Sequence, residues 1–216
     1  MAIGELFFLV LEILGTISFA VSGAMAAIEK RVDLFGVIFL GITTALAGGI
    51  VRDVVIGRVP PAAFSDYKYM AIAIGSALIV FVLARIYQDL YKSNIELIDT
   101  INNIFDAAGL GAFTITGANV AMNMGYRENG FFVVFLAMVT GIGGGILRDL
   151  MIGEIPFVLR KRIYAVASIV GGVIYYILYT KVHMEIMTAA FIGIATVFGL
   201  RMMATIFKWN LPKAFY

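Results

Sequence analysis

The chain has 216 residues, of which 62% are hydrophobic and only 14% are charged. A soluble domain carries about 25% charged residues, because it must cover its surface with polar groups, so lipid must surround most of this chain. The lack of cysteine excludes disulfides and thiolate chemistry, the single histidine excludes a histidine-cluster metal site, and a net charge of +2 is too small to indicate nucleic-acid binding.

Seven apolar stretches are long enough to cross a bilayer, which takes about 20 helical residues. Short connections join them, so we expect a single membrane domain over residues 1–216. The first stretch has no basic segment before it and contains Glu5 and Glu12, so we interpret it as a span and not as a signal peptide. In chain order the predicted spans are 5–28, 35–56, 67–91, 98–122, 129–152, 161–181 and 185–207.

The basic residues predict how these spans are oriented. Seven spans place the two ends of the chain on opposite sides of the membrane. Of the 16 Lys and Arg residues, five then lie on the N-terminal side and eleven, Arg201 among them, on the other. Cytoplasmic loops carry the excess of Lys and Arg, so we expect the N-terminus outside and the C-terminus in the cytoplasm.

One segment of the chain occurs twice. Residues 41–60 read GITTALAGGIVRDVVIGRVP and residues 137–156 read AMVTGIGGGILRDLMIGEIP, with nine identities in twenty positions. Composition explains shared Gly and Ile, but not Arg-Asp and Pro in register. Each unit holds three helices, an odd number, so the second unit is expected to be inverted. We predict an all-α membrane protein with seven transmembrane helices: repeat 1 over about 5–91, repeat 2 over about 98–181, and an extra helix over about 185–207.

Adjacent glycines lie deep inside the second span of each unit. Adjacent glycines commonly mark a kink, and a bilayer tolerates freed backbone only beside protein or a water-filled cavity. The sequence therefore predicts kinks that line a pore, and the alternative is that the glycines let helices pack closely. The residues are Gly48, Gly49, Gly143, Gly144 and Gly145.

Charged residues accompany these glycines. Arg52-Asp53 and Arg148-Asp149 follow them within apolar sequence, where a charge costs about 2.5–3.5 kcal/mol on insertion scales. Glu12 and Asp106 occupy matching places in the first span of each unit. We expect two charged pore mouths with Glu12–Arg52 and Asp106–Arg148 contacts. The alternatives are purely structural ion pairs, or side chains that extend to the headgroups.

Small polar residues between the charged positions form a candidate lining, although each hydroxyl could instead bond a carbonyl of its own helix. Phe19 and Phe113 occupy matching places and are a candidate hydrophobic constriction; the alternative is core packing. Arg160, Lys161 and Arg162 form a basic cluster that either sets orientation or binds anionic lipid headgroups. The candidate lining residues are Ser18, Ser22, Thr44, Thr116, Asn119 and Thr140.

With these motifs in view, the sequence resembles the prokaryotic branch of the trimeric intracellular cation (TRIC) channel family. The residues that carry the resemblance are Ala47 to Asp53 with Ile56 to Pro60, and Gly143 to Asp149 with Ile152 to Pro156. The resemblance implies a homotrimer in a prokaryotic cell membrane, with one K⁺-permeable pore per subunit that also passes Na⁺. It implies that spans 1, 2, 4 and 5 line the pore. Related bacterial sequences are sometimes described as glycine transporters.

Two functions therefore remain open at the level of the sequence. The first is a passive monovalent-cation channel without a cofactor. The second is a secondary transporter of a small zwitterion such as glycine, in which Arg holds the carboxylate and an acid holds the amine. Inverted repeats suit both. An intramembrane enzyme is not expected, because no His-rich or Ser-Lys constellation is present.

Overall fold

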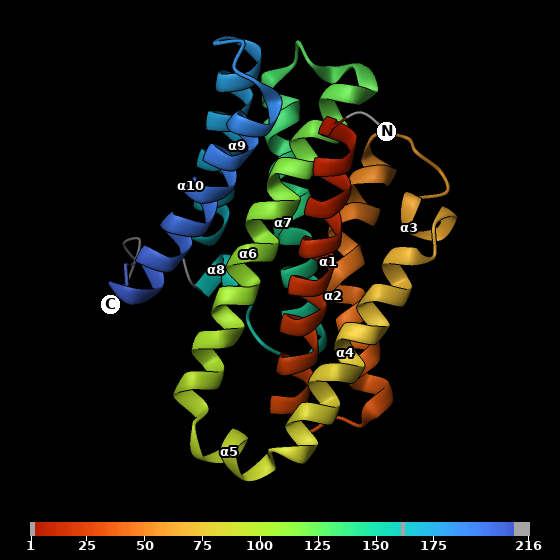
Figure 1. The fold of residues 1–216 in the computed structure, drawn as a ribbon, viewed down its shortest axis with the longest axis vertical. Helices are drawn as coiled ribbons and strands as arrows, with labels where there is room; N and C mark the ends of the chain where they lie inside the picture. Colours follow the sequence, from red (N-terminus) through yellow and green to blue (C-terminus); the bar gives the residue numbers. More distant parts are fainter. Residues whose placement is uncertain (1–2, 161–162, 210–216) are drawn as a thin grey trace.

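The computed structural model describes residues 3–160 and 163–209, and every regular element in that part of the chain is helical (Figure 1). The elements are α1 (Ile3–Glu29), α2 (Leu34–Val55), α3 (Ala62–Ser65), α4 (Lys68–Ile86), α5 (Gln88–Ser93), α6 (Ile95–Ala121), a π-helical turn η1 (Met122–Tyr126), α7 (Gly130–Met151), α8 (Phe157–Arg160), α9 (Tyr164–Thr180) and α10 (Ile186–Ile206).

Six of these helices are long and apolar enough to cross a membrane, namely α1, α2, α4, α6, α7 and α10. The helix α9 is also apolar but has only 17 residues. Each predicted span coincides with one long helix or with α9. The largest difference in bounds is at α4, which ends at Ile86 before the short helix α5 begins. An all-helical membrane architecture is therefore confirmed.

The helices α2 and α7 begin and end in the same way. The side chain of Asp33 accepts the Gly36 amide at 2.8 Å at the start of α2, and that of Asn129 accepts the Phe132 amide at 3.0 Å at the start of α7. After each helix a glycine turns the chain at a positive φ, Gly57 at 76° and Gly153 at 72°. The similar sequences of the two segments thus give similar local structures.

Four long helices form the centre of the molecule: α1 packs against α6, and α2 packs against α7. The helix α4 covers α1 and α2, while α9 and α10 cover α6 and α7 (Figure 1). The short helix α5 lies at the end of the molecule away from the N-terminus. The central four helices therefore contain both copies of the repeated segment.

The crossing of α2 and α7 explains the paired glycines. A Cβ atom on Gly48 would lie 2.1 Å from the Thr140 carbonyl oxygen, and one on Gly144 would lie 2.0 Å from the Thr44 carbonyl oxygen. Both distances are far too short for any side chain. The helices α2 and α7 both continue through their glycines as unbroken helices, and the kinks stay a prediction. Gly48 and Gly144 let the two backbones touch, as small residues do in membranes.

The crossing of α1 and α6 follows the same reciprocal pattern. The ring of Phe19 lies on Gly109, where an added Cβ would come within 2.2 Å of it, and the ring of Phe113 lies on Gly15 with a corresponding 3.0 Å. The two rings meet edge to face with their centroids 5.3 Å apart. Each phenylalanine thus fills a space that a glycine of the other helix leaves open.

Candidate functional site

Two polar cavities lie at opposite ends of the central helices. The Arg52 cavity has a volume of about 290 Å³, and its lining includes Glu12, Arg52 and Tyr69. The Arg148 cavity has a volume of about 170 Å³, and its lining includes Glu29 and Arg148. Glu12 and Glu29 are 17 residues apart on α1, which is about 25 Å of helix. The cavities therefore open at the two mouths of any path through the bundle.

The Arg-Asp pair of each repeat folds into the same ion pair. Arg52 donates from Nε to Asp53 Oδ1 at 2.8 Å, and Arg148 donates from Nε to Asp149 Oδ1, also at 2.8 Å. The second carboxylate oxygen accepts a backbone amide just beyond the helix, Ala62 at 2.8 Å and Phe157 at 2.7 Å. Each aspartate therefore neutralises its arginine and ties down the loop that follows.

The two ends differ in the partner of the acid from the first helix of each unit. Asp106 Oδ1 accepts Arg148 Nη1 at 2.7 Å, so the predicted Asp106–Arg148 contact is present. Glu12 instead accepts the hydroxyl of Tyr69 from α4. Among the described residues no ion pair joins Glu12 to Arg52, although both side chains line the Arg52 cavity. In place of the predicted Glu12–Arg52 contact, the structure pairs Glu12 with the hydroxyl of Tyr69.

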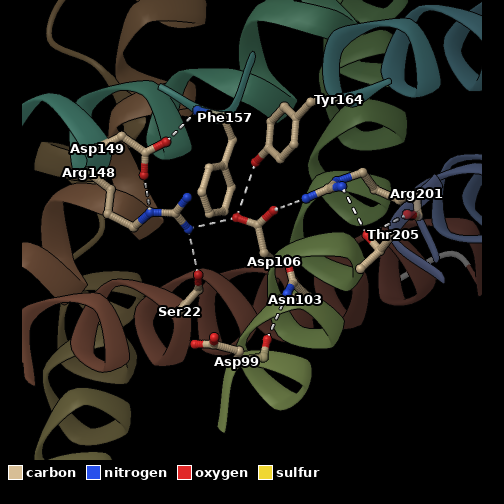
Figure 2. Close-up of polar contacts among 10 residues, drawn as sticks. All are labelled: Ser22, Asp99, Asn103, Asp106, Arg148, Asp149, Phe157, Tyr164, Arg201 and Thr205. Carbon is tan, nitrogen blue, oxygen red and sulfur yellow. Dashed lines mark hydrogen bonds and ion pairs between the residues drawn. The ribbon is translucent and has the colours of Figure 1, made fainter. Parts of the chain in front are cut away.

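Arg148 is the centre of a larger buried cluster, which Figure 2 shows. Its Nη1 also donates to Ser22 Oγ of α1 at 2.6 Å, and the hydroxyl of Tyr164 of α9 reaches Asp106 Oδ1 at 3.2 Å. Arg148 is only 1% exposed, whereas Arg52 is 7% exposed and borders the larger cavity. We call Ser22, Asp106, Arg148, Asp149, Tyr164 and Arg201 the Arg148 cluster.

Arg201 joins this cluster from α10, and sequence reasoning did not select it as a site residue. Its Nη2 lies 3.5 Å from Asp106 Oδ2, its Nη1 donates to Thr205 Oγ1 at 3.3 Å, and its guanidinium lies 4.8 Å from the centre of the Tyr164 ring. Arg201 is 2% exposed. The signal in the sequence was an arginine within the last apolar stretch, which contains no acid beyond Glu185 at its start.

The charges of the Arg148 cluster cancel, because two arginines face two aspartates. Cancellation is required, since an unpaired buried charge destabilises a protein by about 3–5 kcal/mol. The Arg52 cavity is balanced as well, with three acidic side chains (Glu12, Asp53, Asp66) and three basic ones (Arg52, Arg58, Lys68) in its lining. In the loop before α4, Asp66 lies 2.7 Å from Lys68, the first residue of that helix, and the ammonium group holds the pKa of the carboxyl below its usual value.

The predicted lining residues fall into different places. Thr116 and Thr140 line the Arg52 cavity, while Ser22 belongs to the Arg148 cluster. Asn119 accepts the Tyr175 hydroxyl at 3.4 Å, on the side of α9. Ser18 and Thr44 are buried. The hydroxyls of Thr44, Thr116 and Thr140 each bond the carbonyl four residues before them in their own helix.

The phenylalanine pair lies between the two cavities. Along α1 the order is Glu12 of the Arg52 cavity, then Phe19, then Ser22 of the Arg148 cluster. Phe113 of α6 lines the inner part of the Arg52 cavity, and Phe19 beside it is 1% exposed. Apolar rings therefore separate the polar space at one end from that at the other.

The other predicted glycines and the basic cluster lie at separate places in the structure. Gly49 lines the Arg52 cavity, and Gly143 approaches the Gly48 backbone, where an added Cβ would lie 3.0 Å from Cα. Gly145 faces the Tyr164 hydroxyl. Arg160 ends α8, whereas Lys161 and Arg162 lie outside the described residues. Within the described part of the chain no three His, Asp or Glu side chains form a group that could hold a metal ion.

Comparison with protein families and solved structures gives one consistent result. Residues 9–85 and 103–180 match the family model described as Glycine transporter. The UPF0126 inner membrane protein YadS of Escherichia coli is 34% identical over 201 residues, which cover 93% of this chain and 92% of YadS. The UPF0126 membrane protein YvgT of Bacillus subtilis is 36% identical over 203 residues, 94% of each chain.

Solved structures of TRIC channels share the fold. A crystal structure of a prokaryotic TRIC channel in 0.5 M KCl is 34% identical, covers 96% of this chain and 100% of its own, and superimposes with a TM-score of 0.84. The TRIC trimeric intracellular cation channel orthologue from Rhodobacter sphaeroides is 30% identical, covers 94% and 99%, and has a TM-score of 0.83. These relatives are membrane proteins and channels, not enzymes. The chain is therefore an integral membrane protein that belongs to the prokaryotic TRIC channel family.

Proposed function

We propose that this protein is a K⁺-permeable monovalent-cation channel with one pore in each subunit. The observation that carries the proposal is the line of two polar cavities at opposite ends of α1, α2, α6 and α7, separated by Phe19 and Phe113. For ions to pass along this path, the rings must move and the enclosed Arg148 cluster must open. The likeness to solved cation channels supports the same function.

Neutralised arginines let cations enter such a path. An unpaired arginine at each mouth would repel K⁺, but Asp53 pairs with Arg52, while Asp106 and Asp149 pair with Arg148. The Arg148 cavity also carries an acidic excess, with Glu29, Asp99, Asp149 and Glu154 against Lys30 and Arg148. Cavities lined by one sign of charge concentrate ions of the opposite sign, so this mouth favours cations.

The architecture that we propose is a pair of inverted repeats. The reciprocal contacts at the crossing of α2 and α7, Gly48 with Thr140 and Gly144 with Thr44, are those expected for two copies related by a two-fold axis in the membrane plane. Repeat 1 would span about residues 5–91, repeat 2 about 98–181, and α10 would be the helix outside the repeat, within one membrane domain. The apolar helix α9 would be the sixth of seven spans.

Assembly and orientation follow from the same reasoning. We propose a homotrimer, because a solved relative is a trimeric channel, with the N-terminus outside and the C-terminus in the cytoplasm by the distribution of Lys and Arg. The Arg148 mouth would then face the cytoplasm. Arg160, Lys161 and Arg162 would meet anionic headgroups on that side.

A second candidate function is secondary transport of a small zwitterion such as glycine. It is favoured by the family description and by the presence of Arg52 and Glu12 in one cavity, where they would hold a carboxylate and an amine. Recording on a planar bilayer separates the two candidates. We expect ohmic single-channel currents that reverse near the K⁺ potential across a KCl gradient. Saturable glycine uptake without any such current would exclude the channel.

A further inference from the structure

The two mouths are equivalent by sequence but not by structure. At one end Arg52 pairs, among the described residues, with its neighbour Asp53 alone, and it borders a cavity of about 290 Å³. At the other end Arg148 reaches across to Ser22 on α1 and Asp106 on α6, and is enclosed. One component of the enclosed end has no counterpart among the described residues of the open end: Arg201, which α10 supplies from outside the repeat.

Arg201 acts on Asp106 from the side opposite to Arg148. Asp106 Oδ1 accepts hydrogen bonds from Arg148 Nη1 at 2.7 Å and from the Tyr164 hydroxyl at 3.2 Å. The other oxygen, Oδ2, forms an ion pair with Arg201 Nη2 at 3.5 Å (Figure 2). Because each oxygen faces a guanidinium, the carboxylate of Asp106 is held in one orientation. Arg201 also lies against the ring of Tyr164, so it orients the phenol that reaches Oδ1 as well as the carboxylate itself.

The ion pair between Arg201 and Asp106 is weak enough to break. Among the described residues, its Nε and Nη2 atoms donate no hydrogen bond, and Asp106 Oδ2 accepts none. Groups buried in this way are held at an energetic cost. Arg148 also has one such atom, Nη2, but its other two nitrogens donate to three side chains at 2.6–2.8 Å. The contact between α10 and Asp106 is therefore the weak point of the cluster.

We propose that Arg201 is a positioning residue for the Arg148 mouth: by holding the Asp106 carboxylate from α10, it keeps Arg148 bound to Ser22 across α1, α6 and α7 and so keeps that mouth closed. Without Arg201 the cluster has one net negative charge, and Asp106 is free to rotate away from Arg148. The helix outside the repeat thus makes the two equivalent ends unequal. The consequence for conduction rests on the proposed channel function, whereas the consequence for enclosure of Ser22 does not.

Enclosure can be tested without any measurement of transport, because the chain contains no cysteine. Ser22→Cys places a thiol where Arg148 now covers the fully buried hydroxyl, and Ala26→Cys places one in the lining of the Arg148 cavity, one turn further along α1. The protein is held in lipid nanodiscs with both faces accessible, and a charged maleimide is added. With Arg201 present, we expect the Ser22→Cys thiol to react much more slowly than the Ala26→Cys thiol, because Ser22 is 0% exposed and Ala26 is 5% exposed at the wall of the cavity.

Removal of Arg201 should expose the Ser22→Cys thiol. In Arg201→Gln, and in Arg201→Met, which adds no polar group of its own and gives the test a second variant, we expect this thiol to react about tenfold faster, a usual size for coupling between sites. The reaction of the Ala26→Cys thiol should not change. Arg201→Lys, which keeps the charge, should restore most of the protection. Arg127→Gln is the matched control, because it removes an arginine stacked on Tyr179 outside the cluster.

The same variants then connect enclosure to transport. We expect Arg201→Gln and Arg201→Met to raise K⁺ flux into liposomes several-fold, and Arg201→Lys and Arg127→Gln to behave like the unmodified protein. Unchanged protection of the Ser22→Cys thiol in folded Arg201→Gln and Arg201→Met protein overturns the proposal. Exposure of that thiol in protein that conducts no ions in any variant leaves the positioning role in place and overturns the channel function instead.

Discussion

Gly48 on α2 faces the carbonyl oxygen of Thr140 on α7 so closely that a Cβ atom would lie 2.1 Å from it. Gly144 makes the reciprocal approach to the carbonyl oxygen of Thr44, at 2.0 Å. The obstacle to a larger residue is backbone at both positions, and backbone cannot swing aside as a side chain can. The spacing of the two central helices is therefore set by these two glycines.

Gly48→Ala should destabilise the folded protein, because the added methyl forces α2 and α7 apart. Overpacking of this kind costs about 1–3 kcal/mol, so the melting temperature in detergent should fall by several degrees. Gly75→Ala is the matched control, since nothing lies within 4 Å of a Cβ at that position in α4. Equal melting temperatures for the two variants would show that the crossing can widen freely.

Gly144→Leu should go further and abolish K⁺ flux. Its side chain must enter the space between the Thr44 carbonyl and the ring of Phe19, which lies 3.2 Å from an added Cβ. Flux into liposomes measures the effect, and size-exclusion chromatography checks that the variant still assembles. Normal flux through a folded Gly144→Leu protein would place the conduction path elsewhere.

Arg148→Ala should destabilise the protein more than Arg52→Ala. Loss of Arg148 leaves Asp106 and Asp149 buried with only Arg201 nearby, and breaking a buried pair costs about 3–5 kcal/mol. Loss of Arg52 leaves Asp53 beside a cavity that water can enter, so the cost is smaller. Thermal unfolding of both variants tests the order. We also expect Arg148→Ala to change single-channel conductance or open probability.

Phe113→Ala should raise K⁺ flux although it lowers stability. Phe113 is only partly buried, so its truncation should cost less than the roughly 3–5 kcal/mol of a fully buried phenylalanine, and it also opens the apolar barrier between the two cavities. Phe8→Ala is the control for packing alone, because Phe8 is buried in a different part of the core. If both variants lose stability and neither conducts better, the ring pair serves packing only.

Tyr69→Phe should change ion selectivity at the Arg52 mouth. The substitution removes the hydroxyl that Glu12 accepts, so the carboxylate is free to turn toward the cavity or toward Arg52. A hydrogen bond to a charged group contributes about 1.5–3 kcal/mol, so a modest fall in melting temperature should accompany the change. The reversal potential across a KCl gradient measures selectivity, and Glu12→Gln in the same background should cancel the difference.

The membrane class, the positions of the helices and the repeated Arg-Asp pairs could all be predicted from the amino-acid sequence. Hydrophobic length fixes a span locally, because each apolar stretch must satisfy its own backbone hydrogen bonds in lipid. An acid next to an arginine at the end of a helix likewise needs no distant partner, and both pairs formed as neighbours. The Asp106–Arg148 contact was predictable because the repeat placed the two residues on adjacent helices.

Which long side chains complete the two clusters depends on the packing of the helices in three dimensions. Tyr69 and Arg201 reach Glu12 and Asp106 from helices whose spacing in the sequence carries no information about contact. The close contact at the glycines also appears only at this level, because adjacent glycines suit both a kink and a close crossing, and the contact depends on the position of α7 beside α2. The inequality of the two mouths comes from α10, the helix that the repeat does not contain.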